Sequence, residues 1–171
     1  MFRMDDELVK LIEKNEQTHD KKSADANLSV NYLIFKVGLN LFAIQSDQVR
    51  EISRNNKIFQ IPFTPDYIKG VMNFYGKPCA VVDFSLFQNY ASLDSKLFLV
   101  LKDENDIAFQ ISDIQEFYST QVSALQKISG SSENSFFTNA LIYDDGTKPA
   151  SIPILNVSGI LAKIRIDFEN A

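Results

Sequence analysis

Apolar and polar residues alternate along this chain in short runs that predict β-strands. Leu33, Phe35 and Val37 share one face of a strand over 32–37, and residues 97–101 form the continuous apolar run of a buried strand. Further strands are expected over residues 41–44, 58–61, 71–74, 79–82, 107–111, 139–143 and 152–155. Many short strands separated by turn residues indicate an all-β architecture with short helices.

Within the rest of the chain, helices are expected where a capping residue precedes an apolar stretch. These helices cover residues 84–87 after Asp83, residues 157–163 after Asn156, and a brief turn that starts at Thr64 and Pro65. Beyond the last helix, Ile164 and Ile166 are expected to pair in a short strand.

The start of the chain differs in pattern from the rest. Residues 1–17 place apolar side chains on one side of a predicted helix, and residues 16–29 are almost entirely polar. We therefore expect an N-terminal helix and polar linker over 1–28 and a single domain over 29–171. Three interpretations of the N-terminal part remain open: a helix docked on its own domain, an arm that binds a partner, or a disordered tail.

The domain contains an internal repeat of layout. Each half has a hairpin, a connection, and then a strand–turn–strand unit followed by a capped helix. The turns at 76–78 and 146–149 both carry Gly, Lys and Pro in that order. Two such units suggest two small barrels on a shared core, the first over about 31–90 and the second over about 95–165, since closed barrels remove exposed sheet edges. The groove between them would be a natural binding place.

Charge and cysteine content exclude several classes of partner. The net charge is −5 and the pI about 4.9, which argues against nucleic-acid binding and against attraction to anionic membranes. No run reaches the roughly 18 apolar residues of a membrane span, and the first residues lack the apolar core of a signal peptide. We therefore expect a cytoplasmic protein. Cys79 is the only cysteine, so neither an intramolecular disulfide nor a multi-cysteine zinc site can form.

The sequence shows no recognisable set of catalytic residues. His19 is the only histidine and lies in the polar linker, where no neighbouring nucleophile is fixed. Cys79 belongs to an apolar strand, which is typical of a small core residue rather than a reactive thiol. Paired carboxylates occur only in turns or at a helix start. We therefore expect no enzyme activity, no metal site and no cofactor. A binding protein remains, with a small-molecule-binding barrel or enzyme as the disfavoured alternative.

Three spaced segments carry a family resemblance. They are Tyr32-Leu-Ile-Phe-Lys-Val-Gly38, Val49-Arg-Glu-Ile52 and Pro65-Asp-Tyr-Ile-Lys-Gly-Val-Met-Asn73. Together they resemble the CheW family over about residues 31–165. The resemblance implies two pseudo-symmetric, five-stranded, SH3-like β-barrels that share a hydrophobic core, in agreement with the repeat.

The resemblance also implies a function. It suggests a non-enzymatic adaptor that couples the cytoplasmic tip of a chemoreceptor to the regulatory domain of a CheA-type histidine kinase, without inserting into the membrane. The alternative is a diverged CheW-like interaction module that serves another motility or signalling complex.

The resemblance further suggests protein-binding residues. Val49 and Glu51 match the family's V-x-E-I element, and Asn73 and Gly76 match its hairpin. Tyr75 stands where the family has an arginine. A phenol donates one hydrogen bond, whereas a guanidinium forms a two-pronged pair with a carboxylate. Glu51 could instead be a solvated surface carboxylate, and Val49 simply part of the core. Tyr75 could either cover the hairpin end or be an exposed anchor.

Overall fold

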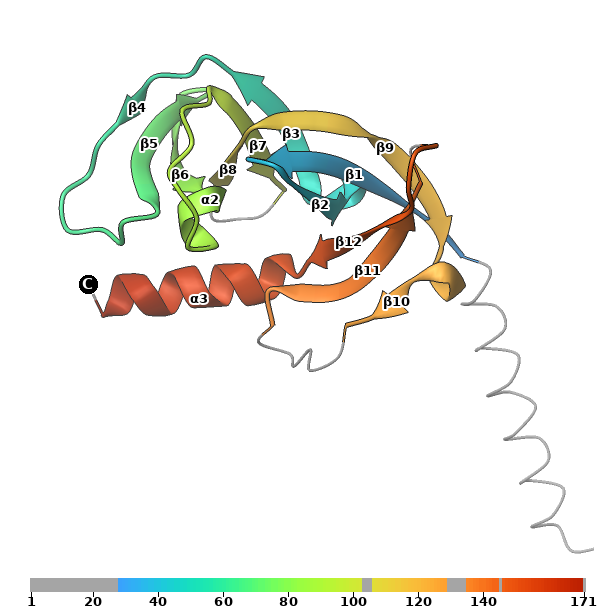
Figure 1. Cartoon of the computed structure of the whole chain (residues 1–171). Coiled ribbons are helices and arrows are strands. Elements are labelled where there is room, and N and C mark those ends of the chain that lie inside the picture. Colours follow the sequence, from blue (N-terminus) through green and yellow to red (C-terminus); the bar gives the residue numbers. More distant parts are fainter. Residues whose placement is uncertain (1–27, 103–105, 129–134, 145, 171) are drawn as a thin grey trace, which may run out of the picture.

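The computed structural model describes residues 28–102, 106–128, 135–144 and 146–170, and these form a mostly β protein (Figure 1). The elements are β1 (Ser29–Val37), β2 (Asn40–Gln45), η1 (Ser46–Gln48), β3 (Val49–Arg54), β4 (Ile58–Phe59), β5 (Ile68–Phe74), β6 (Lys77–Asp83), α2 (Phe84–Phe87), β7 (Leu97–Leu101), β8 (Ile107–Ile111), β9 (Asp113–Gln121), η2 (Val122–Ala124), β10 (Gln126–Lys127), β11 (Phe137–Tyr143), β12 (Ala150–Leu155) and α3 (Val157–Glu169). The helix expected over residues 1–17 lies outside the described residues.

The strands form two six-stranded sheets rather than two five-stranded barrels. The first sheet has the order β10-β11-β12-β2-β1-β9, and the second has the order β3-β7-β8-β6-β5-β4. Among the described residues no pairing joins the outer strands of either sheet, so neither closes into a barrel. The predicted barrel closure is therefore wrong, because the short outer strands β4 and β10 each pair on one edge only.

The two sheets exchange hairpins, so the division at residues 90–95 does not separate them. Hairpin β1–β2 comes from the first half of the chain but lies in the first sheet with β9–β12. Hairpin β7–β8 comes from the second half but completes the sheet begun by β3–β6. The expected boundaries at about 31–90 and 95–165 thus follow the sequence repeat. Each sheet, however, contains strands from both of these ranges. Apolar periodicity predicts strands but not their partners.

The repeated layout itself is present in the structure. In each sheet a hairpin ending in a helix, β5–β6–α2 or β11–β12–α3, pairs in parallel with the hairpin contributed by the other half. The parallel pairs are β12 with β2 and β6 with β8. The two halves of the sequence therefore build equivalent units.

A shared core holds the two sheets together. It contains buried side chains of β1 and β2 from the first sheet, of β6 to β8 from the second, and of both helices. Phe42 and Phe84 meet edge to face with ring centroids 5.4 Å apart, and Phe35 lies 6.3 Å from Phe84. Removing one buried phenylalanine of this kind typically costs about 3–5 kcal/mol. Each curled sheet also encloses a smaller apolar core of its own.

Helix α3 connects the sheets at the end of the chain. Figure 1 shows it leading from β12 toward the second sheet. Ile160 and Ile164, four residues apart, are buried in the shared core, and the Tyr67 hydroxyl donates to Asp167 at 2.7 Å. The expected strand at Ile164 and Ile166 is therefore wrong: the helix continues, and Ile166 points away from the core, about half exposed.

Two other expectations need correction. The segment after Pro65 forms a single turn, closed by the Ile68 amide on the Pro65 carbonyl at 2.8 Å, because β5 already begins at Ile68 and leaves no room for a helix. Strand β9 was not expected, since most of its side chains are exposed and give no alternating apolar pattern.

A buried carboxylate closes β6 and starts α2. Asp83 is fully buried, and its two oxygens accept four hydrogen bonds. The donors are the amides of Ser85 at 3.0 Å, Leu86 at 3.1 Å and Leu93 at 3.0 Å, and the Ser92 hydroxyl at 2.8 Å. The Lys69 ammonium lies 3.7 Å away. The equivalent cap in the first sheet, Asn156, accepts from the Gly159 amide at 3.2 Å.

We expect Asp83→Ala to lower the free energy of unfolding by about 3 kcal/mol, because it leaves buried amides without an acceptor and Lys69 without a counter-ion. Chemical denaturation followed by circular dichroism measures this loss. Asn156→Ala is the matched control and should cost less, about 2 kcal/mol, because it removes a helix cap and the bond from Asn156 Nδ2 to the Ser135 carbonyl. Equal losses in the two variants would contradict a special role for Asp83.

Candidate functional site

Two of the predicted site residues, Glu51 and Tyr75, meet on the surface. The Tyr75 hydroxyl donates to the Glu51 carboxylate, with distances of 3.0 Å to Oε2 and 3.2 Å to Oε1. Tyr75 is 81% exposed, and Glu51 is partly buried. The chain thus places a phenol and a carboxylate together at a solvent-facing position, although 24 residues separate them.

The turn that carries Tyr75 is conformationally unusual. Phe74 pairs with Lys77, so the β5–β6 hairpin has a two-residue loop, Tyr75-Gly76. Both loop residues have positive φ angles, 50° and 83°, as a type I′ turn requires. Gly76 adopts this conformation freely, but a tyrosine does so at a cost of order 1 kcal/mol. The Asn73 side chain supports the loop by accepting from the Gly76 amide at 2.8 Å.

A bulge in β3 shapes the carboxylate side of the site. Val49 pairs with Leu101 and Glu51 with Val100, so Arg50 is the extra residue between them. Arg50 bonds Asp106 at 2.9 Å, and its guanidinium lies 6.0 Å from the centre of the Phe74 ring.

The curl of the second sheet brings these parts together. In the strand order, β3 and β5 are separated by three strands, so a flat sheet would hold Glu51 and Tyr75 far apart. The sheet instead wraps around its own core, which includes Phe74. The Tyr75 ring packs edge to face on Phe74 with centroids 4.7 Å apart. Phe74 therefore anchors the exposed tyrosine to the core.

The other predicted residues have different surroundings. Val49 is half-buried and packs against the shared core, as the packing interpretation predicted. Asn73 and Gly76 belong to the turn and bond each other. Arg50 and Phe74 were not expected at the site. Their only sequence signal was adjacency to Glu51 and Tyr75, because the pairing of β3 with the hairpin end depends on the curl.

Electrostatics favour the neutral phenol. Donation to Glu51 and the proximity of its negative charge raise the pKa of Tyr75 above its ordinary value of 10.0. Within the described part of the chain, Glu51 forms no salt bridge. The site therefore presents an aromatic ring beside a carboxylate that has no Lys or Arg ion-pair partner among the described residues.

The described residues contain no other arrangement suited to chemistry. Cys79 is fully buried, and no three His, Cys, Asp or Glu side chains gather within these ranges as a metal would need. Among the helices that the structure describes, none is long and apolar enough to cross a membrane. His19 lies outside the described residues.

Comparison with known proteins gives a family and a similar solved structure. A family model described as a CheW-like domain matches residues 31–165. The crystal structure of scaffolding protein TtCheW from Thermoanaerobacter tengcongensis superposes with a TM-score of 0.67 at 16% identity, over 75% of this chain and 90% of that chain. At this identity the likeness concerns the fold. Among curated proteins, no sequence matches this chain.

We expect Glu51→Gln to lower the Tyr75 pKa back toward 10.0, since it removes the negative charge that holds the phenol proton. Titration of the Tyr75 ring signals by NMR measures the change. Because the folded pKa lies above the unfolded value, stability from this bond is fully present below about pH 10 and is lost as pH rises through the raised pKa. Glu116→Gln, which alters a carboxylate bonded to Tyr143, should leave the Tyr75 titration unchanged.

Proposed function

This chain belongs to the CheW-like domain family, and we propose that it is a non-enzymatic adaptor that couples chemoreceptors to a CheA-type histidine kinase in chemotaxis. The observation that carries the proposal is the family match over residues 31–165, which spans both sheets. We also propose that residues 29–171 act as one domain, because the exchanged hairpins leave no point at which the sheets could part. The helix and linker over 1–28 stay a prediction.

We place a partner contact at Glu51 and Tyr75. Exposed tyrosines are enriched among residues that dominate binding energy, since they bury a large rigid surface at little entropic cost. Tyr75 is held in a strained turn on a buried phenylalanine, and its hydroxyl is already fixed by Glu51. A preorganised aromatic group of this kind loses little freedom on binding. Asn73 and Gly76 would stabilise the turn that carries Tyr75. Val49 would hold β3 in place by packing against the shared core.

One observation favours the second candidate, a diverged CheW-like module of another motility or signalling complex. Where the family resemblance predicts an arginine paired with Glu51, the chain has Tyr75 and a single hydrogen-bond donor. The local charge is therefore more negative than an Arg–Glu pair would give. A partner that binds at Glu51 and Tyr75 must be complementary to an acidic, aromatic surface.

We expect Tyr75→Ala and Glu51→Ala each to weaken partner binding about 30-fold while the fold stays intact, as truncation of a dominant contact does. Biolayer interferometry against the regulatory domain of a CheA-type kinase and against a chemoreceptor-tip fragment measures the change. Glu169→Ala, at an exposed carboxylate near the end of α3, serves as the control and should bind like the unchanged protein.

Absence of binding to either fragment by the unchanged protein would refute the chemotaxis proposal and favour the second candidate. Tyr75→Arg separates the two further. It should strengthen binding to a chemoreceptor tip if the partner is a standard receptor, and weaken binding if the partner reads the acidic, aromatic surface. Unchanged affinity in both alanine variants would place the interface elsewhere.

A further inference from the structure

Large apolar side chains are exposed at the outer edge of the second sheet. Phe59 of β4, and Ile61 and Phe63 after it, follow one another at every second position. Phe63 is 92% exposed, Phe59 about half exposed and Ile61 40% exposed. We name these three residues the β4 ridge. Exposed apolar side chains gathered along an edge strand are typical of an interaction surface.

The backbone of the β4 ridge is closely held. A Cβ atom at Gly70 of β5 would come within 2.1 Å of the Phe59 carbonyl oxygen, so only glycine permits this approach of the two strands. After β4, the Thr64 hydroxyl donates to the Ile61 carbonyl at 3.3 Å, and Phe63 between them adopts a left-handed conformation with φ of 58°. Side chains on a fixed backbone lose little freedom on binding.

A positively charged cleft adjoins the ridge. Its volume is about 480 Å³, and we name it the lysine cleft after three of its lining residues, Lys57, Lys69 and Lys96. The Lys57 ammonium lies 5.1 Å from the centre of the Phe59 ring, so the cleft and the β4 ridge form one continuous surface. One carboxylate, Asp94, also lines the cleft.

The positive charge of the lysine cleft is only partly compensated. Lys69 lies 3.7 Å from the buried carboxylate of Asp83. Lys57 and Lys96 form no ion pair within the described ranges. Because the whole chain has a net charge of −5, a local excess of positive charge runs against its composition. The cleft therefore favours an occupant that carries carboxylates.

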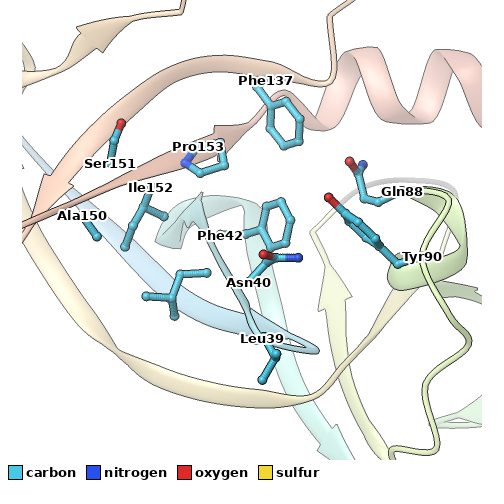
Figure 2. A pocket seen from close by; sticks show the side chains of 11 residues that line it. Leu39, Asn40, Phe42, Gln88, Tyr90, Phe137, Ala150, Ser151, Ile152 and Pro153 are labelled. Carbon is cyan, nitrogen blue, oxygen red and sulfur yellow. The ribbon is translucent and has the colours of Figure 1, made fainter.

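The first sheet has a cleft without such charge. It lies between β2 and β12, which pair only at Ile154 with Ala43, and its volume is about 430 Å³. Figure 2 shows its lining, which includes Pro153, a residue with no N–H to donate to a neighbouring strand. None of the described residues that line this cleft is charged. Charge complementarity therefore selects an occupant for the lysine cleft but not for the cleft of the first sheet.

The chain itself contains a segment of matching chemistry. Residues 1–17 combine apolar side chains on one side of the helix that the sequence predicts with an excess of acidic residues. The apolar residues are Leu8, Val9, Leu11 and Ile12, and five acidic residues, Asp5, Asp6, Glu7, Glu13 and Glu16, outnumber the three basic ones, Arg3, Lys10 and Lys14. The apolar side of this segment suits the β4 ridge, and its carboxylates suit the lysine cleft.

The point where the described chain begins favours a contact with a second copy. The Leu28 carbonyl accepts from the Val122 amide at 3.0 Å, which holds the start of β1 beside η2. Figure 1 shows the start of β1 and β4 at opposite ends of the molecule. The ten residues 18–27 span at most about 36 Å even when fully extended. A segment that leaves one end of the domain reaches the opposite end of a neighbour without passing around its own domain.

We propose that residues 1–17 of one chain bind the β4 ridge and the lysine cleft of a second copy of this chain. The contact joins different surfaces of the two copies, so it is heterologous and can continue from copy to copy. It uses a segment outside the family match over residues 31–165 and surface residues separate from Glu51 and Tyr75. The proposal therefore goes beyond the adaptor role.

Sedimentation velocity of the full chain over a range of concentrations tests the contact. The unchanged protein should self-associate. Phe63→Asp and Lys57→Glu should each weaken self-association about tenfold, because the first removes an apolar contact and the second reverses a charge. Phe117→Asp, at a phenylalanine of β9 that is 67% exposed, is the matched control and should associate like the unchanged protein.

A mixing experiment assigns the two sides of the contact. The double variant Leu8→Gln/Ile12→Gln lacks the apolar side of the segment, and Phe63→Asp lacks an intact ridge. At a concentration where each variant alone is monomeric, their equimolar mixture should form a 1:1 dimer, because one retains the segment and the other retains the ridge. Circular dichroism of each variant reports whether it is folded.

A monomeric unchanged chain at every concentration would overturn the proposal, since the segment would then fold back on its own domain or the ridge would serve another partner. Full self-association of Phe63→Asp, or a mixture of folded variants without a dimer, would overturn it as well. Tyr75→Ala should associate like the unchanged protein, so failure of the adaptor contact and failure of this contact are distinguishable.

Discussion

Each sheet of this protein depends on a hairpin supplied by the other half of the chain. Hairpin β1–β2 lies between β12 and β9 in the first sheet, and β7–β8 lies between β3 and β6 in the second. Neither half could therefore complete its own sheet, and one face of each hairpin packs into the shared core. This constraint makes one cooperative unit of two similar parts, since separating them would break the parallel pairs and expose the shared core together.

The exchange of hairpins fixes the middle of each sheet, but the turns and strand ends of the two sheets can differ. In the second sheet, the curl around the core places the β5–β6 turn against β3, so that Tyr75 reaches Glu51. In the first sheet, Pro153 prevents the corresponding parallel pairing from extending, and a cleft remains. Two equivalent units thus present different surfaces.

Much of the fold could be predicted from local pattern. The caps Asp83 and Asn156 both precede helices, and the turn at Gly76 lies between two paired strands. Strand β9 could not be predicted, because its pairing with β1 is specified by backbone bonds rather than by an apolar face. The length of α3 was missed although Val157, Ile160 and Ile164 have helical spacing, because the alternation of Ile164 and Ile166 also fits a short strand.

By itself, the sequence determined the all-β class, the repeat and the family resemblance, since these depend on residue type and local spacing. Only the tertiary structure decided which hairpin joins which sheet, that the sheets stay open, and that Tyr75 bonds Glu51. The physical reason is that strand partners and sheet curl are selected by burial over long sequence distances. Alternating apolar residues specify a buried face, but they do not specify what covers it.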